Sequence, residues 1–234
     1  MYVEFVGTPG AGKTTLVGCI RVLCKKEGEE CVTRADFFRP NKKRMYKIVW
    51  TLLHLHYLDW QTFYFLWLLS RKRRLSFGNT AIKIHEHLKL QYQLSRRDKN
   101  VPVLWDAGFV QQFANLVILG LRSETEIVEF IHRRLPLDTL LVFLDTPPRE
   151  TVKRKREREF LLTAQIGVKP KESAFSDEES HMLGAYRIYK NILSELARRN
   201  ISTTTLDGMK SPEENAAVVY AEISRRMQRD HATL

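Results

Sequence analysis

Short apolar runs of strand-like length recur along the 234-residue chain and alternate with longer stretches of helical periodicity. Five of these runs are rich in β-branched or aromatic residues, and they cover residues 2–6, 30–35, 101–105, 139–144 and 201–206. Apolar runs separated by helices are typical of a parallel sheet whose two faces are both covered. The pattern therefore predicts a single α/β domain over residues 1–234, with a doubly wound, parallel five-stranded sheet and helices on both faces.

Residues that suit ligand binding stand directly after the apolar runs. The first four runs are followed by Gly7, Asp36, Asp106 and Asp145, and the fifth is followed by Asp207 and Gly208. In open α/β sheets, ligands bind beyond the carboxyl ends of the strands. We therefore expect the functional residues to gather at that edge of the sheet.

A nearly continuous apolar stretch covers residues 48–69, between basic residues at 42–44 and 71–74. Its length alone would suit a membrane span, but a span here would place the second and third strands on opposite sides of the bilayer. Large apolar residues recur in it at steps of three and four, namely Trp50, Leu53, Tyr57, Trp60, Tyr64 and Trp67. The spacing predicts a buried or cleft-lining helix within a helical insertion at 40–98, while the basic flanks leave docking on a membrane surface open.

All the fixed positions of a Gly-x-x-x-x-Gly-Lys-Thr phosphate-binding loop are present at residues 7–14, which we call the phosphate loop. Its glycines allow successive N–H groups to point at phosphate oxygens, and the helix expected after it presents its positive end to the same anion. Lys13 would reach the β- and γ-phosphates, and the Thr14 hydroxyl would ligate magnesium. The predicted ATP-binding residues are Gly7, Thr8, Pro9, Gly10, Ala11, Gly12, Lys13, Thr14 and Thr15. The sequence has no Asn/Thr-Lys-x-Asp guanine-reading motif, which favours ATP over GTP.

Two aspartates at strand ends are candidates for the chemistry. Asp106, after the third run, could hold the water shell of magnesium opposite Thr14, because this ion takes few protein ligands and several waters. Asp36, after the second run, could orient an acceptor hydroxyl or take its proton. Either aspartate could instead cap a helix, and that alternative stays open at this point.

An arginine-rich segment follows the fourth run and reads Lys-Arg-Lys-Arg-Glu-Arg-Glu at 153–159. A helix here would carry Arg154 and Arg158 on one face, where two guanidinium groups could neutralise charge on a transferring phosphoryl group. The alternative is a solvated helix in which Glu150 pairs with Arg154. Residues 167–179 are polar and contain proline, which predicts a mobile loop. We expect residues 149–181 to form an arginine-rich lid.

The chain carries a formal net charge of +11, which favours anionic partners. A nucleotide asks only for local arginines, whereas nucleic acid or an anionic membrane surface would favour a broad basic face. Cys19, Cys24 and Cys31 lie near the start of the sequence without metal-ligand spacing, so free thiols are expected. Because no cleavable signal precedes the first strand, a reducing cytoplasm is the expected location. A homodimer is compatible with all of these features.

The order of these features resembles that of the thymidylate kinase and deoxynucleoside kinase group of P-loop kinases. In that group the third strand ends in an acidic residue followed by arginine, an arginine-rich lid follows Leu-Asp-x-x-Pro, and a loop after the last strand contacts adenine. The matching places here are Asp106, residues 144–148 with Arg154 and Arg158, and residues 206–208, while Asp36 matches the acid that faces the acceptor. The resemblance implies phosphoryl transfer from ATP. Position 107 is alanine, so the arginine that grips the acceptor's phosphate in thymidylate kinases is missing.

Together these features predict a magnesium-dependent kinase that moves the γ-phosphoryl group of ATP to a small acceptor, either nucleoside- or nucleotide-like or another hydroxyl compound. The insertion at 40–98 would shape the acceptor side of the site. The predicted catalytic residues are Lys13, Asp36, Asp106, Arg154 and Arg158, and the predicted magnesium ligands are Thr14 and Asp106. A second interpretation is a nucleotide-hydrolysing module that docks on nucleic acid or a membrane surface through its basic, aromatic insertion. A kinase that acts on nucleic-acid ends would combine the two.

Overall fold

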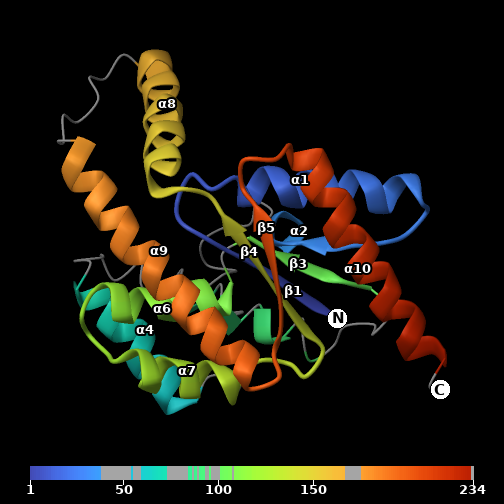
Figure 1. The fold of residues 1–234 in the computed structure, drawn as a ribbon. Helices are drawn as coiled ribbons and strands as arrows, with labels where there is room; N and C mark the ends of the chain where they lie inside the picture. The colour runs from blue at the N-terminus through green and yellow to red at the C-terminus, as the bar shows by residue number, and fades with distance from the viewer. Residues whose placement is uncertain are drawn as a thin grey trace.

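Five parallel strands form one sheet in the computed structural model of the chain, in the order β2-β3-β1-β4-β5 (Figure 1). The strands are β1 (Tyr2–Val6), β2 (Val32–Thr33), β3 (Val103–Trp105), β4 (Thr139–Asp145) and β5 (Ser202–Asp207), and their pairings are parallel. The structure describes residues 1–37, 54, 59–72, 84–85, 87–88, 90–92, 95, 101–106, 108–166 and 175–232. The predicted parallel five-stranded α/β sheet is therefore confirmed.

Helices cover both faces of the sheet, which confirms the doubly wound arrangement (Figure 1). On one face, α1 (Lys13–Lys26) packs against α10 (Pro212–Ala232). On the other face lie α6 (Phe109–Ile118), α7 (Glu124–His132) and α9 (Phe175–Arg198), with α4 (Trp60–Lys72) packed against α6. Helix α8 (Pro148–Ile166) follows β4 and extends away from the sheet (Figure 1), and its Arg156 contacts Glu178 in the first turn of α9.

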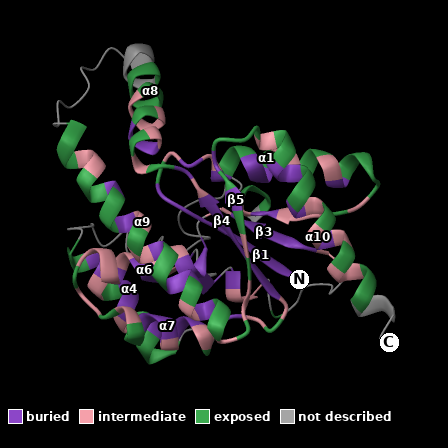
Figure 2. Cartoon of the chain, viewed as in Figure 1, coloured by how far each residue is buried: buried purple, intermediate pink, exposed green. Residues whose placement is uncertain are grey.

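Alternate residues of the strands feed two separate cores on either side of the sheet, where the buried residues are purple in Figure 2. In β1, Tyr2 and Val6 belong to the core formed with α6, α7 and α9, whereas Val3 and Phe5 belong to the core formed with α1 and α10. Because side chains alternate along a strand, Glu4 points to the same side as Tyr2 and Val6. A fully buried carboxylate therefore lies on the α6 side of the central strand.

The second strand is shorter than predicted. The apolar run predicted a strand over 30–35, but β2 ends at Thr33 and a short helix, α2 (Arg34–Phe37), begins directly after it. The backbone N–H and the hydroxyl of Thr33 each donate a hydrogen bond of 2.8 Å to Asp36 Oδ2. An acid that accepts a hydrogen bond from the backbone N–H three residues before it is half of a capping box, which favours the start of a helix and ends the strand early.

The cysteines are free thiols, as predicted. Cys24 of α1 is buried and shares a side-chain hydrogen bond with Cys31, which stands just before β2. Cys19, also on α1, is partly exposed. The two thiols of residues 24 and 31 therefore help to seat α1 beside the edge of the sheet.

Helix α4 confirms that part of the insertion predicted at 40–98 is helical, but its aromatic face is not buried as expected. The residues that pack inward are Thr62, Phe65, Leu66, Leu69 and Ser70, whereas Trp60 is 77% and Trp67 40% exposed. Apolar residues occur all round this helix, so spacing alone did not determine which face would be buried. Trp50, Leu53 and Tyr57 lie outside the described residues. Among the helices that the structure describes, none combines the length and hydropathy needed to cross a membrane.

The predicted mobile loop at 167–179 is wrong over its last five positions, because α9 begins at Phe175. Asp177 and Glu178 occupy the first turn of this helix. Negative side chains interact favourably with the positive end of a helix, so these polar residues start the helix instead of extending the loop. Residues 167–174 lie outside the described part of the chain.

Candidate active site

The phosphate loop connects β1 to α1, as predicted, and its backbone curls at Gly10. Gly10 has a φ of 91°, a conformation that L side chains rarely adopt. A Cβ atom at this position would also lie only 2.5 Å from the carbonyl oxygen of Thr151 in the first turn of α8. The loop therefore requires glycine at this position both for its curvature and for the close packing of α8 beside it.

Lys13, the first residue of α1, turns its ammonium group back into the loop. Its Nζ donates hydrogen bonds to the carbonyl oxygens of Gly7 at 2.6 Å and Thr8 at 3.0 Å. Burial lowers the pKa of Lys13 to about 8, the charge of Asp106 opposes this change, and the charge of Arg158 adds to it. Lys13, Asp106 and Arg158 therefore act on one another electrostatically, although they are far apart in sequence.

The two predicted magnesium ligands are brought together across neighbouring strands. The Thr14 hydroxyl donates a 2.6 Å hydrogen bond to Asp106 Oδ2. Thr14 follows β1 and Asp106 follows β3, and these strands are paired in the sheet. A hydroxyl and a carboxylate oxygen at one point fit the oxygen preference of magnesium, which fills its other positions with water and substrate oxygens. The donor set thus fits the ion, with Thr14 and Asp106 as the groups that would hold it.

The two arginines that were predicted to clamp the phosphoryl group have different surroundings in the structure. Both lie on α8, as expected, but Arg154 Nε donates to Glu150 Oε1 at 2.9 Å and its Nη1 donates to the carbonyl oxygen of Gly208 at 3.2 Å. Arg154 is therefore held against the turn that follows β5. Arg158 is exposed, and its charge acts on Lys13. Of the two, Arg158 is the one whose charge reaches the phosphate loop.

Asp36 lies in α2 instead of at the end of a strand, and both of its carboxylate oxygens accept hydrogen bonds. Besides the two hydrogen bonds from Thr33, Asp36 Oδ1 accepts one from Arg21 Nη2 at 2.7 Å. Burial would raise the pKa of Asp36, but the hydrogen bonds from Thr33 and Arg21 bring it below its usual value. A carboxylate with a lowered pKa is a weak proton acceptor, so this environment suits holding a ligand better than removing a proton.

The aspartates that end β4 and β5 support the edge of the sheet. Asp145 Oδ1 accepts a 2.6 Å hydrogen bond from the Tyr186 hydroxyl of α9, and Lys190 Nζ lies 3.6 Å from Asp145 Oδ2. The side chain of Asp207 accepts a hydrogen bond from the backbone N–H of Met209. These contacts fix the turn after β5 and join the middle of α9 to the end of β4.

Sequence reasoning missed Glu4. Its carboxylate is fully buried in the middle of β1, three positions before the phosphate loop, and contacts the first turn of α6. The available signal was a single acidic residue inside an otherwise apolar central strand, which is rarely buried without a specific partner.

Comparisons with known proteins found similarity to solved structures alone. No family model matches the chain, and no curated protein does. Among solved structures, deoxyadenosine kinase from M. mycoides with bound dATP has 12% identity and a TM-score of 0.49, with 96% of this chain and 100% of that chain covered. Shikimate kinase from Acinetobacter baumannii in complex with shikimate has 16% identity and a TM-score of 0.43, with 96% and 93% covered.

Proposed function

We propose that this protein is an ATP-dependent phosphotransferase that moves the γ-phosphoryl group to a small acceptor bearing a hydroxyl group. The observation that carries the proposal is the meeting of Lys13, Thr14 and Asp106 at the carboxyl ends of β1 and β3. A curled loop with a central ammonium group, beside a hydroxyl–carboxylate pair, matches the needs of a triphosphate with its metal ion. This inference depends on the residues of the chain itself.

In the proposed reaction, backbone N–H groups of the phosphate loop and the Lys13 ammonium hold the β- and γ-phosphates. Thr14 and Asp106 would hold magnesium, which when bound neutralises charge on those phosphates. Arg158, placed by α8, would stabilise the charge that develops on the transferring group. The acceptor oxygen forms the new P–O bond and releases its proton to solvent, the bond between the γ-phosphorus and the β–γ bridging oxygen breaks, and ADP leaves with that oxygen.

The proposed roles of the other two predicted residues follow from their contacts. Arg154 and the turn at Gly208 would border the base of ATP, because Arg154 is fixed against that turn. Asp36 would hold the acceptor by hydrogen bonds. Alanine at position 107 offers no cation to an acceptor phosphate, which favours recognition through hydroxyl groups.

The test is turnover of ATP labelled on its γ-phosphate, with magnesium and pools of nucleosides, nucleotides, sugars and short oligonucleotides. Lys13→Ala is expected to abolish transfer while the protein stays folded. Lys25→Ala is the matched control, since this exposed lysine lies on the same helix. Label in a pooled compound that depends on Lys13 supports the proposal. Normal transfer by Lys13→Ala, or no transfer to any pool, would count against it.

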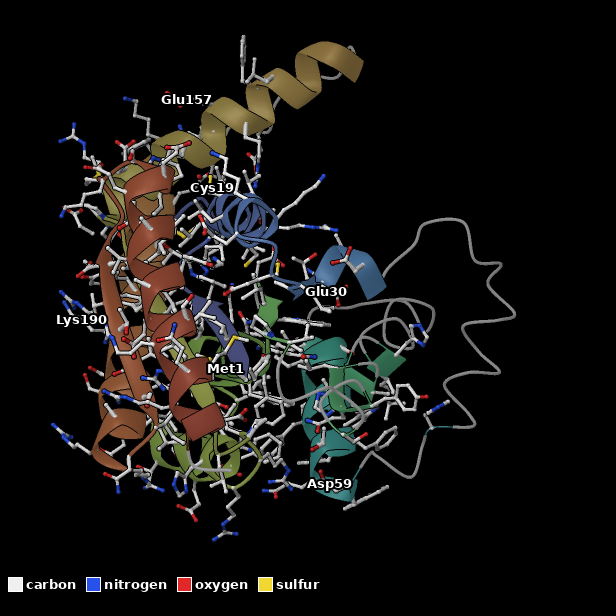
Figure 3. All side chains as sticks on the ribbon, turned by 90° about the vertical axis from the view of Figure 1, so that its right-hand side faces the viewer. Met1, Cys19, Glu30, Asp59, Glu157 and Lys190 are labelled. Carbon is white, nitrogen blue, oxygen red and sulfur yellow. The ribbon has the colours of Figure 1, made fainter. Side chains whose placement is uncertain are left out.

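The exposed face of α4 favours a second candidate function, a nucleotide-hydrolysing module that docks on an anionic surface. Trp60, Phe63 and Trp67 are exposed along one side of this helix, and the Arg71 guanidinium lies 5.4 Å from the centre of the Trp67 ring. Asp59, at the start of α4, and Glu157, on α8, lie at opposite ends of the view in Figure 3. Docking through α4 would therefore leave α8 accessible.

The two candidates are separated by sedimentation with anionic vesicles and by binding to labelled DNA and RNA at low salt. If docking occurs, a Trp60→Ser, Trp67→Ser double variant is expected to lose it. Val22→Ser, at an exposed valine of α1 on the other face of the sheet (Figure 1), is the control. The absence of binding to vesicles and nucleic acids alike would exclude the docking module.

A further inference from the structure

Glu4 is an ionisable group that is completely buried in the sheet. It is 0% exposed in the central strand, and an ionised carboxylate is costly to bury unless it is fully hydrogen-bonded. Oε1 accepts a hydrogen bond from the backbone N–H of Gln111 at 2.9 Å. Oε2 accepts one from the backbone N–H of Val110 at 3.0 Å and one from the Tyr2 hydroxyl at 2.9 Å. Three donors thus converge on this one side chain.

Two of these donors belong to the first turn of α6, where backbone N–H groups lack partners within the helix. Gly108, the N-cap residue of α6, supplies no side-chain cap. In α7, by contrast, the cap is local, because the Ser123 hydroxyl accepts a hydrogen bond from Glu126 N–H. Glu4, which lies on β1, therefore provides the N-terminal cap that the residues next to α6 do not supply.

The connection between β3 and α6 is packed directly on this carboxylate. A Cβ atom at Gly108 would lie 2.2 Å from the Tyr2 hydroxyl and 2.8 Å from the carboxyl carbon of Glu4. Asp106 lies two residues before Gly108 and, through its contact with Thr14, closes the site. Strand β1 thus leads into the phosphate loop and, through Glu4, also holds the start of α6, the helix that follows Asp106.

We infer that Glu4 is a positioning residue, which fixes the start of α6 and thereby holds Asp106 at the distance from Thr14 that magnesium binding requires. The catalytic part of this inference rests on the proposed function, whereas the anchoring part does not. Burial raises the pKa of Glu4 to about 7, against the hydrogen bonds from Gln111, Val110 and Tyr2 that favour its charged form. Among the described residues, Tyr2 is the titratable group that faces it, and burial keeps that phenol protonated.

The first experiment measures backbone hydrogen exchange in wild type and in Glu4→Gln, which keeps the shape of the side chain but loses its charge. Peptides covering residues 103–112 are expected to exchange about tenfold faster, since a hydrogen bond to a charged group contributes a factor of this order. Ser123→Ala is the matched control, because it removes the cap of α7 and should speed exchange there alone. Unchanged exchange at 103–112 in Glu4→Gln would overturn the inference.

The second experiment follows turnover as magnesium is varied. Glu4→Gln is expected to need about tenfold more magnesium for half-maximal rate, with the KM for the acceptor unchanged, because Asp106 is displaced and the acceptor side is not. Ser123→Ala should leave the magnesium requirement as in wild type. Equal magnesium requirements in wild type and Glu4→Gln would refute the positioning role.

Hydrogen exchange is measured without any enzymatic activity. A wild-type protein that transfers no phosphoryl group would therefore refute the proposed function, while the anchoring of α6 by Glu4 could still be tested. If Glu4→Gln does not fold, Tyr2→Phe tests the same anchor, because it removes the hydroxyl that donates to Glu4 and keeps both hydrogen bonds from the α6 backbone to Glu4. It should change exchange at 103–112 in the same direction by a smaller factor, and no change in that variant would overturn the inference.

Discussion

Replacing Lys13 with methionine should make the protein more stable while removing its ability to bind a triphosphate. Lys13 is 9% exposed, and its pKa falls from 10.5 to about 8. Because one pKa unit corresponds to about 1.4 kcal/mol, the folded state carries a cost of about 3 kcal/mol for keeping this ion at pH 7. Methionine removes that cost but leaves two loop carbonyls without their donor, at about 1 kcal/mol each. The expected net gain in free energy of unfolding is about 1 kcal/mol.

The sign of the pH dependence makes this prediction specific. Below pH 8, Lys13 is protonated in the folded and the unfolded chain, so the stability difference between the two proteins is constant. Between pH 8 and 10.5 the folded chain releases this proton while the unfolded chain keeps it, so wild-type stability rises relative to Lys13→Met. The relative change should reach about 2 to 3 kcal/mol by pH 10, which reverses the order of the two proteins.

Urea unfolding followed by tryptophan fluorescence at pH 7, 8, 9 and 10 checks this prediction. Lys25→Met, at an exposed position of the same helix, should show no such dependence. At pH 7, ATP should then stabilise wild type but not Lys13→Met. A stability difference that stays constant from pH 7 to 10 would refute the reasoning, because it would mean that the ammonium group is not perturbed in the folded state.

Three further outcomes are expected. Asp106→Asn should weaken binding of ATP with magnesium, measured by calorimetry, while leaving metal-free ATP binding equal or tighter, because it removes a negative charge from the site. Binding of ATP at pH 8 should be accompanied by proton uptake, since the phosphate charge raises the pKa of Lys13. Calorimetry in buffers of different ionisation enthalpy measures this uptake. It would detect no proton uptake if Lys13 were already fully charged. Burial opposes the lowered pKa of Asp59, but hydrogen bonds from Arg134 and Thr62 dominate, and the ion pair with Arg134 is 2.8 Å long. Asp59→Asn should therefore cost about 1 kcal/mol above pH 4, after allowance for solvent screening, with the loss fading as pH falls below 3.8 in urea unfolding.

The sheet and the phosphate loop could be predicted because their signals are local. A run such as residues 139–144 can bury both faces only in the middle of a covered sheet, and β4 has this position. The spacing of Gly10, Lys13 and Thr14 reflects the geometry of one short turn. Asp106 could be placed opposite Thr14 because parallel strands bring their carboxyl ends to one edge.

The errors arose where specific side-chain contacts decide between alternatives that the hydrophobic pattern leaves open. The run at 30–35 has strand-favouring residues at Val32 and Thr33, but the capping interaction between Thr33 and Asp36 favours a helix from residue 34. In α4, the choice of face depends on Phe65 meeting Phe130, whose ring centres are 4.8 Å apart. The partners of Glu4 in α6, Val110 and Gln111, lie more than a hundred residues away in the sequence, so the local sequence does not indicate its capping role.

The charges around the phosphate loop explain why the cations there differ in role. Arg154 is held by Glu150 and by the carbonyl oxygen of Gly208, so its charge is largely satisfied within the protein. Within the part of the chain that the structure describes, no ion pair holds Arg158, and its charge lowers the pKa of Lys13. Burial is the main reason that the pKa of Lys13 falls to about 8; the charge of Asp106 opposes the fall, and Arg158 makes a smaller contribution to it. With Lys13 and Arg158 positive and Asp106 negative, the site still carries an excess of positive charge that a bound polyphosphate would neutralise, which supports the binding of a strongly anionic donor at this loop.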